Sequence, residues 1–289
     1  MAGMLYLCAT PIGNLEDITV RVLRVLKEVD LIAAEDTRNS IKLLNHFEIH
    51  TPMTSYHEFN KYDKAKVLVE KMLAGMDVAL ITDAGTPGIS DPGEELVRQA
   101  YDAGLSVTSL PGAAACVTAL TLSGLSTRRF AFEAFLPTEK KERAAILESL
   151  KRESRTIVLY EAPHRLVRTL EELADVLGNR AVSVCKELTK RHETVCRFHL
   201  EEAAAYYQEW EPKGEYVLVI EGKSLEEQRE ECQAEKRKLP LTEQMEQYLA
   251  QGFSKKEAMK AVAAERGISR RDVYQMLLEL ESQEDLGKQ

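Results

Sequence analysis

The chain has 289 residues, of which 44% are hydrophobic and 29% charged, and its formal net charge is −9. This composition is ordinary for a globular protein, and the length is sufficient for two or more domains. The negative net charge argues against a protein that coats nucleic acid indiscriminately, although it leaves room for a local basic surface.

Residues 4–110 alternate strand-like and helix-like segments, which predicts a mostly parallel sheet covered by helices. Short apolar runs predict the strands, and apolar residues at helical spacing predict the helices. The predicted elements are strand 4–9, loop 10–16, helix 17–29, strand 31–34, helix 39–47, helix 61–73, strand 78–82, helix 94–101 and strand 106–110.

The segment 78–93, VALITDAGTPGISDPG, joins a buried-strand run to a loop rich in Gly, Pro and polar residues. Loops at the carboxyl ends of strands are where α/β proteins bind small ligands. Gly85 and Gly88 allow the backbone to approach a ligand closely, and Asp83 and Thr86 offer polar contacts. The alternative is an ordinary connection between a strand and a helix.

A second α/β unit follows a helix of small residues that begins near Pro111-Gly112 and ends at Gly124. No helix is expected between two of its strands, so the second sheet should be mixed, with some antiparallel pairing. The predicted elements are strand 130–135, helix 140–150, strand 156–160, helix 166–177 and strands 182–185, 194–199 and 216–220.

The last part of the chain predicts a charged linker and a three-helix unit that resembles a helix-turn-helix module. Helices are expected at 243–250, 255–265 and 270–280, with Gly252 and Gly267 as C-caps and Ser254 and Ser269 as N-caps. The stretch 253–271 has six basic and two acidic residues, which suits phosphate contact, although a solvated face is the alternative. The predicted division is 1–112, 113–222, 223–239 and 240–289.

We expect a cytoplasmic protein that neither crosses a membrane nor binds a metal. No apolar run approaches the roughly 20 residues of a membrane span, and residues 1–14 lack the features of a signal peptide. The five cysteines are scattered without CxxC spacing, which indicates reduced thiols. The six histidines show no ligand spacing with cysteines or carboxylates.

The common nucleotide motifs are absent from the sequence. No two glycines are two residues apart, so neither a GxGxxG fingerprint nor the glycine-rich loop of common Rossmann methyltransferases occurs. GxxxxGK[ST], HExxH and GxSxG are also missing. An α/β protein with several ligand-like loops and none of these motifs needs a different cofactor.

Seven segments in register resemble the tetrapyrrole-methylase superfamily over residues 4–222. Within it, they are most similar to the branch that methylates the 2′-hydroxyl of ribose in small-subunit ribosomal RNA. One departure is Ala134, where the family pattern has Gly. The segments are ATPIGNLEDITVRVLRVLKEVDLIAAEDTR (9–38), TDAGTPGISDPG (82–93), LPGAAA (110–115), FLPTEKKER (135–143), YEAPHR (160–165), KELTKRHET (186–194) and GEYVLVIEG (214–222).

The resemblance implies two α/β domains with S-adenosylmethionine in the cleft between them. Small residues suit such a cleft because backbone groups, more than side chains, would hold the cofactor. The residues implied for cofactor binding are Pro11, Ile12, Asp83, Ala84, Gly85, Thr86, Ile89, Ala114, Ala115, Glu161 and Ala162.

Methyl transfer to a ribose hydroxyl requires in-line positioning and either a general base or a cation that stabilises the alkoxide. Candidate bases are Asp17, Glu35, Asp36, Asp83, Glu161 and Glu187, and candidate cations are Arg38, Arg165, Lys186, Lys190 and Arg191. We expect catalysis from Glu35, Asp36, Arg38, Lys186 and Glu187, on the wall opposite the 82–93 loop. Each adjacent charge pair has the alternative role of an ion pair or a helix cap.

By resemblance, the substrate is a cytidine in the decoding centre of 16S rRNA and the enzyme is a homodimer. One alternative is C-methylation of a corrin or porphyrin ring with the same cofactor and fold. Another is a non-catalytic regulator that binds nucleic acid through its helical module. The basic stretch 253–271 and the TPIGN form of the first loop favour RNA as substrate.

Overall fold

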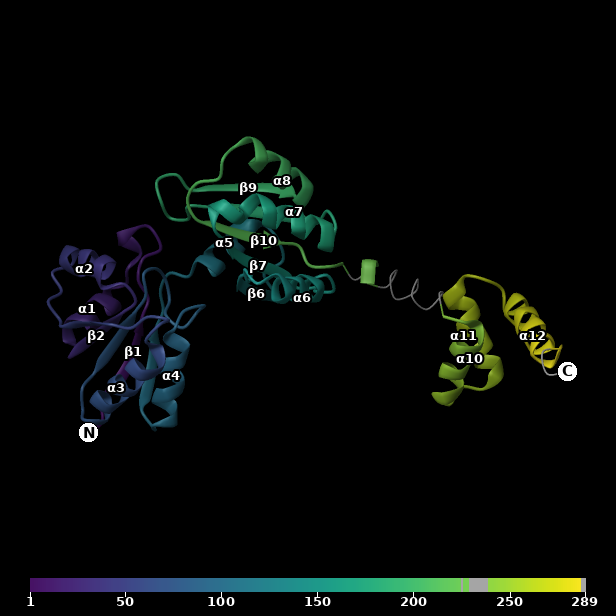
Figure 1. Ribbon diagram of the computed structural model, residues 1–289, viewed down its shortest axis with the longest axis horizontal. Helices are drawn as coiled ribbons and strands as arrows, with labels where there is room; N and C mark the ends of the chain where they lie inside the picture. The colour runs from purple at the N-terminus through teal and green to yellow at the C-terminus, as the bar shows by residue number, and fades with distance from the viewer. Residues whose placement is uncertain (225, 229–238, 287–289) are drawn as a thin grey trace. The chain divides into compact units, whose positions relative to one another are not determined.

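The computed structural model describes residues 1–224, 226–228 and 239–286, and describes side chains as far as residue 280. Its contacts divide the chain into two units, Met1–Gly222 and Lys223–Gln289 (Figure 1). Most of the predicted linker 223–239, with Cys232, lies outside the described residues. The four-part domain division stays a prediction.

The first sheet is entirely parallel, with the strand order β3-β2-β4-β1-β5. Its strands are β1 (Met4–Cys8), β2 (Leu31–Ala34), β3 (Met53–Ser55), β4 (Val78–Ile81) and β5 (Ser106–Leu110). A short 3₁₀ turn, η1, and four α-helices connect them: η1 (Leu15–Asp17), α1 (Val20–Glu28), α2 (Thr37–His46), α3 (Lys61–Leu73) and α4 (Gly93–Asp102).

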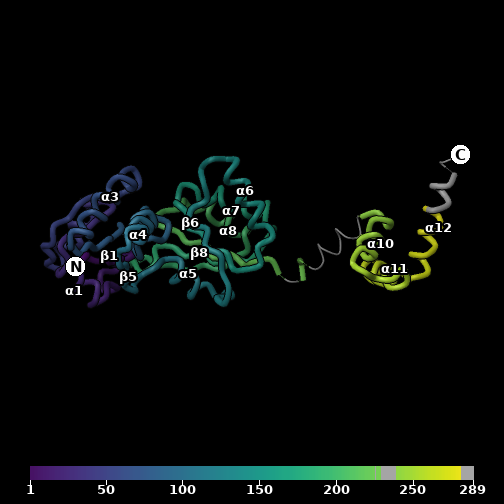
Figure 2. The backbone as a smooth tube through the Cα atoms, turned by 90° about the horizontal axis from the view of Figure 1, so that it is seen from below, coloured from purple at the N-terminus to yellow at the C-terminus, as the bar shows by residue number. Residues whose placement is uncertain are grey.

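The helices cover both faces of this sheet. Helices α1 and α2 pack with one set of alternate strand residues, including Ile32 and Ala79, whereas α3 and α4 pack with the other, including Leu5 and Leu80. Figure 2 shows α1 and α3 on opposite sides of β1. Right-handed crossovers explain this arrangement, because the connections after β1 and β2 run toward β3, and those after β3 and β4 run toward β5. The connections after the neighbouring strands β1 and β4 therefore run in opposite directions, over opposite faces of the sheet.

The second sheet has the order β6-β7-β10-β8-β9, in which β6 and β7 are parallel and the other pairs antiparallel. The predicted mixed sheet and the α/β class are therefore confirmed. The strands are β6 (Phe130–Phe135), β7 (Thr156–Glu161), β8 (Ala181–Lys186), β9 (Thr194–His199) and β10 (Tyr216–Ile220). The helical segments are α5 (Ala115–Ser123), α6 (Lys140–Leu150), η2 (Pro163–Arg165), α7 (Leu166–Leu177) and α8 (Leu200–Glu209).

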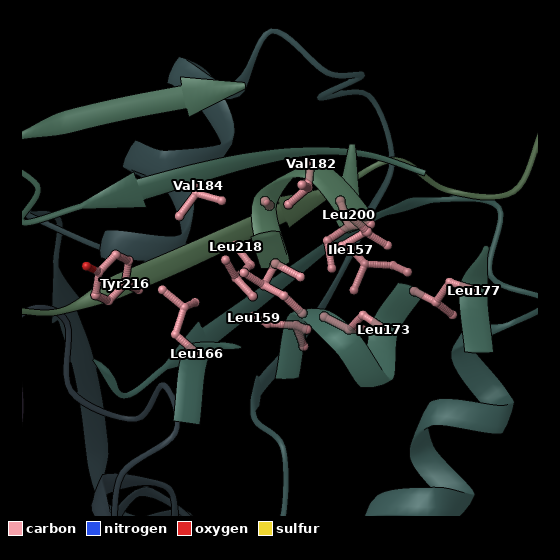
Figure 3. Close-up of a cluster of buried hydrophobic side chains, with 14 of the residues drawn as sticks. Ile157, Leu159, Leu166, Leu173, Leu177, Val182, Val184, Leu200, Tyr216 and Leu218 are labelled. Atoms are coloured by element: carbon pink, nitrogen blue, oxygen red, sulfur yellow. The ribbon is translucent and has the colours of Figure 1, made fainter. Parts of the chain in front are cut away.

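Helices also cover both faces of the second sheet. Side chains such as Ile157, Leu159 and Leu218 point toward Leu166 and Leu173 of α7 (Figure 3), in a core that α6 and α8 complete. The small-residue helix α5 packs on the other face, against residues of β7, β8 and β10. The alternation of the strand side chains explains why a continuous apolar run such as YVLVI is buried on both faces.

Apart from the short 3₁₀ turns η1 and η2, one strand and one helix were not predicted from the sequence. Strand β3 is three half-buried residues, too short for a periodic signal. Helix α8 buries Leu200, Ala203, Ala204 and Tyr207, which have the helical spacing that identified the other helices. Helix α1 begins three residues later than predicted, because Thr19 accepts a hydrogen bond from the Val22 backbone amide and so caps it.

The second unit contains α10 (Leu241–Ala250), α11 (Lys255–Arg266) and α12 (Arg270–Leu286), around a core that includes Leu241, Val262 and Val273. Ser254 and Glu257 form a reciprocal capping box at the start of α11, and Gly267 ends that helix in the left-handed conformation. Ser269 and Asp272 exchange backbone–side-chain hydrogen bonds at the start of α12. No helix in the described part of the chain is long and apolar enough to cross a membrane.

Ala134, the departure from the family pattern, lies at an irregularity of β6. The pairing with β7 shifts register between Phe132 and Ala134, and Ala134 has a φ of 50°. A left-handed conformation is unfavourable for any residue with a Cβ, and glycine is the usual residue at such a bulge. The bulge therefore forms without glycine and stores backbone strain.

We predict that Ala134→Gly stabilises the protein by up to about 1 kcal/mol. Relief of left-handed strain, about 1–2 kcal/mol, exceeds the entropy that glycine adds to the unfolded chain. Thermal or denaturant unfolding measures the change. Ala131→Gly, at a buried position of the same strand, is the matched control and should destabilise by about 1 kcal/mol. A destabilised Ala134→Gly protein would contradict this account.

Candidate functional site

The loops that follow β1 and β4 are joined by an isolated antiparallel bridge. The Thr10 amide donates to the Gly85 carbonyl at 2.9 Å, and the Gly85 amide donates to the Thr10 carbonyl at 3.1 Å. The Thr10 hydroxyl, in a residue only 1% exposed, donates to the Thr82 carbonyl at 3.1 Å. These bonds hold together the loops of two neighbouring strands whose connections leave toward opposite faces of the sheet, where open α/β sheets usually have their ligand crevice.

The loop after β4 takes its shape from Asp91. The Asp91 carboxylate accepts hydrogen bonds from the backbone amides of Gly88, Ile89 and Gly93, at 2.8, 3.1 and 2.7 Å. A Cβ on Gly93 would lie 2.7 Å from that carboxylate and 2.9 Å from the Gly88 nitrogen. A side chain at Gly93 is thus incompatible with the turn, and Asp91 shapes the loop.

A cavity of about 330 Å³, which we call the cleft, lies between the loops of the two sheets. Its volume is at the lower end of the range for small-molecule sites, and most of its lining is apolar. The first-sheet wall consists of Ile12, Ala84, Gly85, Thr86 and Ile89. The other wall consists of Ala114, Ala115, Phe135, Tyr160, Glu161, Ala162, Pro163, Leu188, Glu215, Tyr216 and Val217.

The second wall depends on the direction of β10. Because β10 is antiparallel to β7 and β8, its first residues lie at the edge where those strands end, and Tyr216 pairs with both Glu161 and Lys186. Glu215 and Val217 reach the cleft for the same reason. They were not predicted, because the GEYVLVIEG segment identifies a strand but not its direction.

Small residues leave backbone groups accessible in the first wall. Gly85 has a φ of 84°, and a Cβ there would lie 3.3 Å from the Ile12 side chain and 3.4 Å from the Ala113 carbonyl. That carbonyl also accepts a hydrogen bond from the Thr86 hydroxyl at 2.9 Å. Glycine therefore keeps open a narrow space that suits a flat group bound through the backbone.

A second pocket of about 440 Å³ shares Ile12, Ala84 and Glu215 with the cleft. It is lined mainly by polar and charged residues of the β1 loop, α2 and the start of the β4 loop. The remaining lining residues are Thr10, Pro11, Gly13, Leu15, Asn39, Ser40, Lys42, Leu43, His46, Thr82, Asp83 and Lys190. An apolar cleft and a more polar pocket thus adjoin at the same edge of the first sheet.

Lys190 lines the second pocket and contacts Glu215, which lines both spaces. Its ammonium group contacts the Glu187 carboxylate at 2.9 Å and the Glu215 carboxylate at 2.8 Å. Its stem is close to Gly13, where a Cβ would lie 2.5 Å from Lys190 Cγ. The β1 loop and the loop after β8 therefore approach each other only because residue 13 is glycine.

The loop after β8 is strained. Glu187 and Thr189 have φ values of 51° and 65°, in the left-handed region that side chains disfavour. Thr189 Oγ1 is buried with no hydrogen-bond partner among residues 1–224, 226–228 and 239–286. Strain of this kind concentrates at functional sites, where the surrounding structure must maintain it.

Nine of the eleven residues predicted to bind the cofactor line the cleft, and Pro11 and Asp83 line the second pocket instead. Their contact with a cofactor stays a prediction. Glu161 is buried, and its carboxylate accepts hydrogen bonds from the Thr169 hydroxyl at 2.6 Å and the Ala162 amide at 2.8 Å, with Arg165 at 3.3 Å. Its carboxylate is thus fully engaged within the wall.

None of the five predicted catalytic residues lines either space. Asp36 caps α2 by accepting a hydrogen bond from the Arg38 amide at 2.8 Å, and it pairs with the Arg38 guanidinium at 2.9 Å. These contacts hold the pKa of Asp36 at about 2, which makes it a weak base. The geometry of this pair matches the helix-cap alternative. Lys186 ends β8, and Glu187 holds Lys190 and accepts the Glu215 amide at 2.9 Å.

Glu35 lies beside Asp83, whose backbone amide donates to it. Burial raises the pKa of Glu35 above its ordinary 4.5, and the Asp83 carboxylate raises it further. The ionised form is therefore less favourable in the folded protein than in the unfolded chain. The stability that a protonated Glu35 contributes is complete below about pH 4.5 and is lost as the pH rises through the folded-state pKa.

We predict that Glu35→Gln becomes progressively more stabilising, relative to the natural protein, as the pH rises from 4 toward 7. Gln removes the carboxylate charge at position 35 and keeps a side-chain oxygen that can accept the hydrogen bond from the Asp83 backbone amide. Denaturant unfolding of both proteins at several pH values tests this. A stability difference that stays constant or falls with pH would contradict the environment described for Glu35.

Comparisons with known proteins were consistent with these observations. A family model described as Tetrapyrrole (Corrin/Porphyrin) Methylases matches residues 4–204. The chain is 50% identical over 272 residues to a protein of Halalkalibacterium halodurans named ribosomal RNA small subunit methyltransferase I, covering 94% of this chain and 93% of that protein. A Synechocystis protein of the same name is 48% identical over 281 residues, covering 97% and 99%.

The fold is similar to a solved structure of uroporphyrin-III C-methyltransferase from Thermus thermophilus, complexed with S-adenosyl homocysteine. The TM-score is 0.55 at 21% sequence identity, and the match covers 76% of this chain and 97% of that one. At this identity the likeness shows the fold alone.

Proposed function

Because the chain belongs to the tetrapyrrole (corrin/porphyrin) methylase family, we propose that it methylates the ribose 2′-hydroxyl of a cytidine in the decoding centre of 16S rRNA. It is an S-adenosylmethionine-dependent methyltransferase, and its relatives point to ribosomal RNA as the substrate. The observation on which the proposal depends is the apolar cleft that adjoins a more polar pocket at the carboxyl ends of β1 and β4.

The cleft fits the methyl donor. Its small apolar residues and the open space beside Gly85 suit an adenosine held through backbone groups. We assign the donor to Ile12, Ala84, Gly85, Thr86 and Ile89 on one wall and to Ala114, Ala115, Glu161 and Ala162 on the other. When bound, S-adenosylmethionine supplies an electrophilic methyl group.

The second pocket is then the place for the nucleotide that accepts the methyl group. A ribose hydroxyl is a weak acid, so its oxygen needs a cation nearby and its proton needs an acceptor. Lys190 supplies the cation, and the Asp83 carboxylate, which lines the same pocket, accepts the proton. Glu187 positions Lys190 and Glu35 positions the Asp83 backbone, which gives two of the predicted catalytic residues supporting roles.

We further propose a cytoplasmic homodimer. Helix α5 is rich in apolar residues on every side, yet Val117 and Leu122 are exposed in the single chain. A helix apolar on all sides is normally buried, so a second copy of the chain is a suitable cover. Size-exclusion chromatography with light scattering would give twice the monomer mass, and a monomer at micromolar concentration would contradict this.

The alternative substrate is a corrin or porphyrin precursor, because the family description and the name of the solved structure both refer to methylation of such rings. Incubation with labelled S-adenosylmethionine and either 30S subunits or a porphyrin precursor separates the two. We expect label in RNA, in a cytidine that resists alkaline cleavage at its 3′ side because its 2′-hydroxyl is blocked. Label in the tetrapyrrole, or on a base of the RNA, would overturn the proposal.

We predict that Lys190→Ala lowers kcat on 30S subunits by about 100-fold, as loss of one charge-stabilising donor typically does. The affinity for S-adenosylmethionine, measured by calorimetry, should change less than about twofold. Lys71→Ala, at an exposed position of α3, is the control and should leave both quantities unchanged. Normal turnover of Lys190→Ala would remove Lys190 from the mechanism.

A further inference from the structure

Phe59 is an exposed aromatic residue in the segment between β3 and α3. Its side chain is 97% exposed. An isolated exposed apolar residue is common on protein surfaces and needs no explanation by itself. Phe59 differs from the other exposed residues in two ways: hydrogen bonds hold the segment that carries it, and that segment lies at the edge of the sheet that bears the cleft.

The segment that presents Phe59 is held firmly. The His57 amide donates to the Asn60 side-chain oxygen at 2.9 Å, and the Asn60 side-chain nitrogen lies 3.3 Å from His57 Nε2. The His57 and Phe59 rings meet edge to face, with centroids 6.1 Å apart. Tyr56, which precedes His57, is buried, and its hydroxyl donates to the Pro92 carbonyl at 2.8 Å. The segment that carries Phe59 is therefore tied to the loop that lines the cleft, and the Phe59 ring itself stays exposed.

The position of Phe59 follows from the parallel sheet. All five strands end at the same edge, so the segment after β3 lies at the edge that bears the cleft and the second pocket. Strand β3 is two strands from β4 and three from β1, which corresponds to about 10 and 14 Å at the usual strand spacing. Between them, after β2, the 88%-exposed Arg38 side chain is held by Asp36.

Aromatic and basic side chains alternate beside Phe59. The Lys61 ammonium lies 5.3 Å from the centroid of the exposed Tyr62 ring, and it pairs with Glu58 at 2.6 Å. Lys64 and Asp63 follow. Glu58 and Asp63 offset the positive charges of Lys61 and Lys64. Stacking of a base on the aromatic ring would therefore have to supply most of the free energy of nucleic-acid binding at this segment. Single-stranded nucleic acid is bound in this way, by aromatic rings that stack on unpaired bases.

We infer that Phe59 is a stacking platform for an unpaired base of the RNA strand whose target nucleotide enters the second pocket. This inference rests on the proposed function, and it adds a recognition site outside both the cleft and the pocket. The RNA strand would follow the carboxyl edge of the first sheet, passing Arg38 on its way from the second pocket to Phe59.

Three variants at this position test the inference on 30S subunits. Phe59→Ala and Phe59→Leu should each lower kcat/KM by about 10-fold or more, because loss of base stacking has effects of that size. Phe59→Trp should retain activity. The affinity for S-adenosylmethionine should be unchanged in all three. Tyr101→Ala, an exposed aromatic at the end of α4 and so at the opposite edge of the sheet, is the control.

The outcomes separate this inference from the proposed function. Wild-type activity in Phe59→Ala would overturn the inference and leave the proposed function intact, and equal activity of the Leu and Trp variants would overturn stacking. If the natural protein methylates no RNA, the proposed function fails. Fluorescence anisotropy with a single-stranded oligonucleotide then tests base stacking on Phe59 by itself. Weaker binding by Phe59→Ala than by the natural protein supports the stacking platform, and unchanged binding overturns it.

Discussion

The backbone bridge between Thr10 and Gly85 is the interaction on which the site depends. It joins the loops of two neighbouring strands whose connections leave in opposite directions, and it is buried. Ile12 and Ala84, which flank the bridge, line both the cleft and the second pocket. Two backbone hydrogen bonds thus fix the boundary at which a donor and an acceptor nucleotide would meet, and catalysis by positioning requires such a fixed boundary.

The second sheet contributes charge and strain to this boundary. Its antiparallel strand β10 brings Glu215 to the edge where β8 ends, and Glu215 and Glu187 together hold Lys190. The close approach of Lys190 to Gly13 links the loops of the two sheets. The left-handed residues Glu187 and Thr189 indicate that this loop is maintained by its contacts rather than by local preference.

Much of the fold could be predicted from local patterns. The segments 61–73, 130–135 and 166–177 were predicted with their observed bounds, because long apolar periodicities and flanking turn residues define them. Properties that depend on the whole chain could not be predicted. The direction of β10 is one such property, and it determines which residues complete the second wall of the cleft. The bulge at Ala134 is another, because its backbone conformation contradicts the preference of alanine.

The candidate site was predicted in part. The loops that line the cleft were identified by motif, whereas the catalytic candidates were chosen because adjacent charges suggested chemistry. For Asp36 and Arg38 the simpler explanation, a capped helix with its ion pair, matches the observed geometry. Lys190 was one of five candidate cations in the sequence. What distinguishes it from the others is that its own loop, the β1 loop at Gly13 and the segment before β10 at Glu215 come together around it.

The central claim, that the methyl donor binds in the cleft, is tested most directly by calorimetric titration of S-adenosylhomocysteine into Ala114→Phe. The introduced ring would occupy the cleft, so we expect affinity to fall at least about tenfold, with the thermal unfolding midpoint unchanged. Ala205→Phe, on the exposed face of α8, should bind as the natural protein does. Undiminished binding by a folded Ala114→Phe protein would contradict the account.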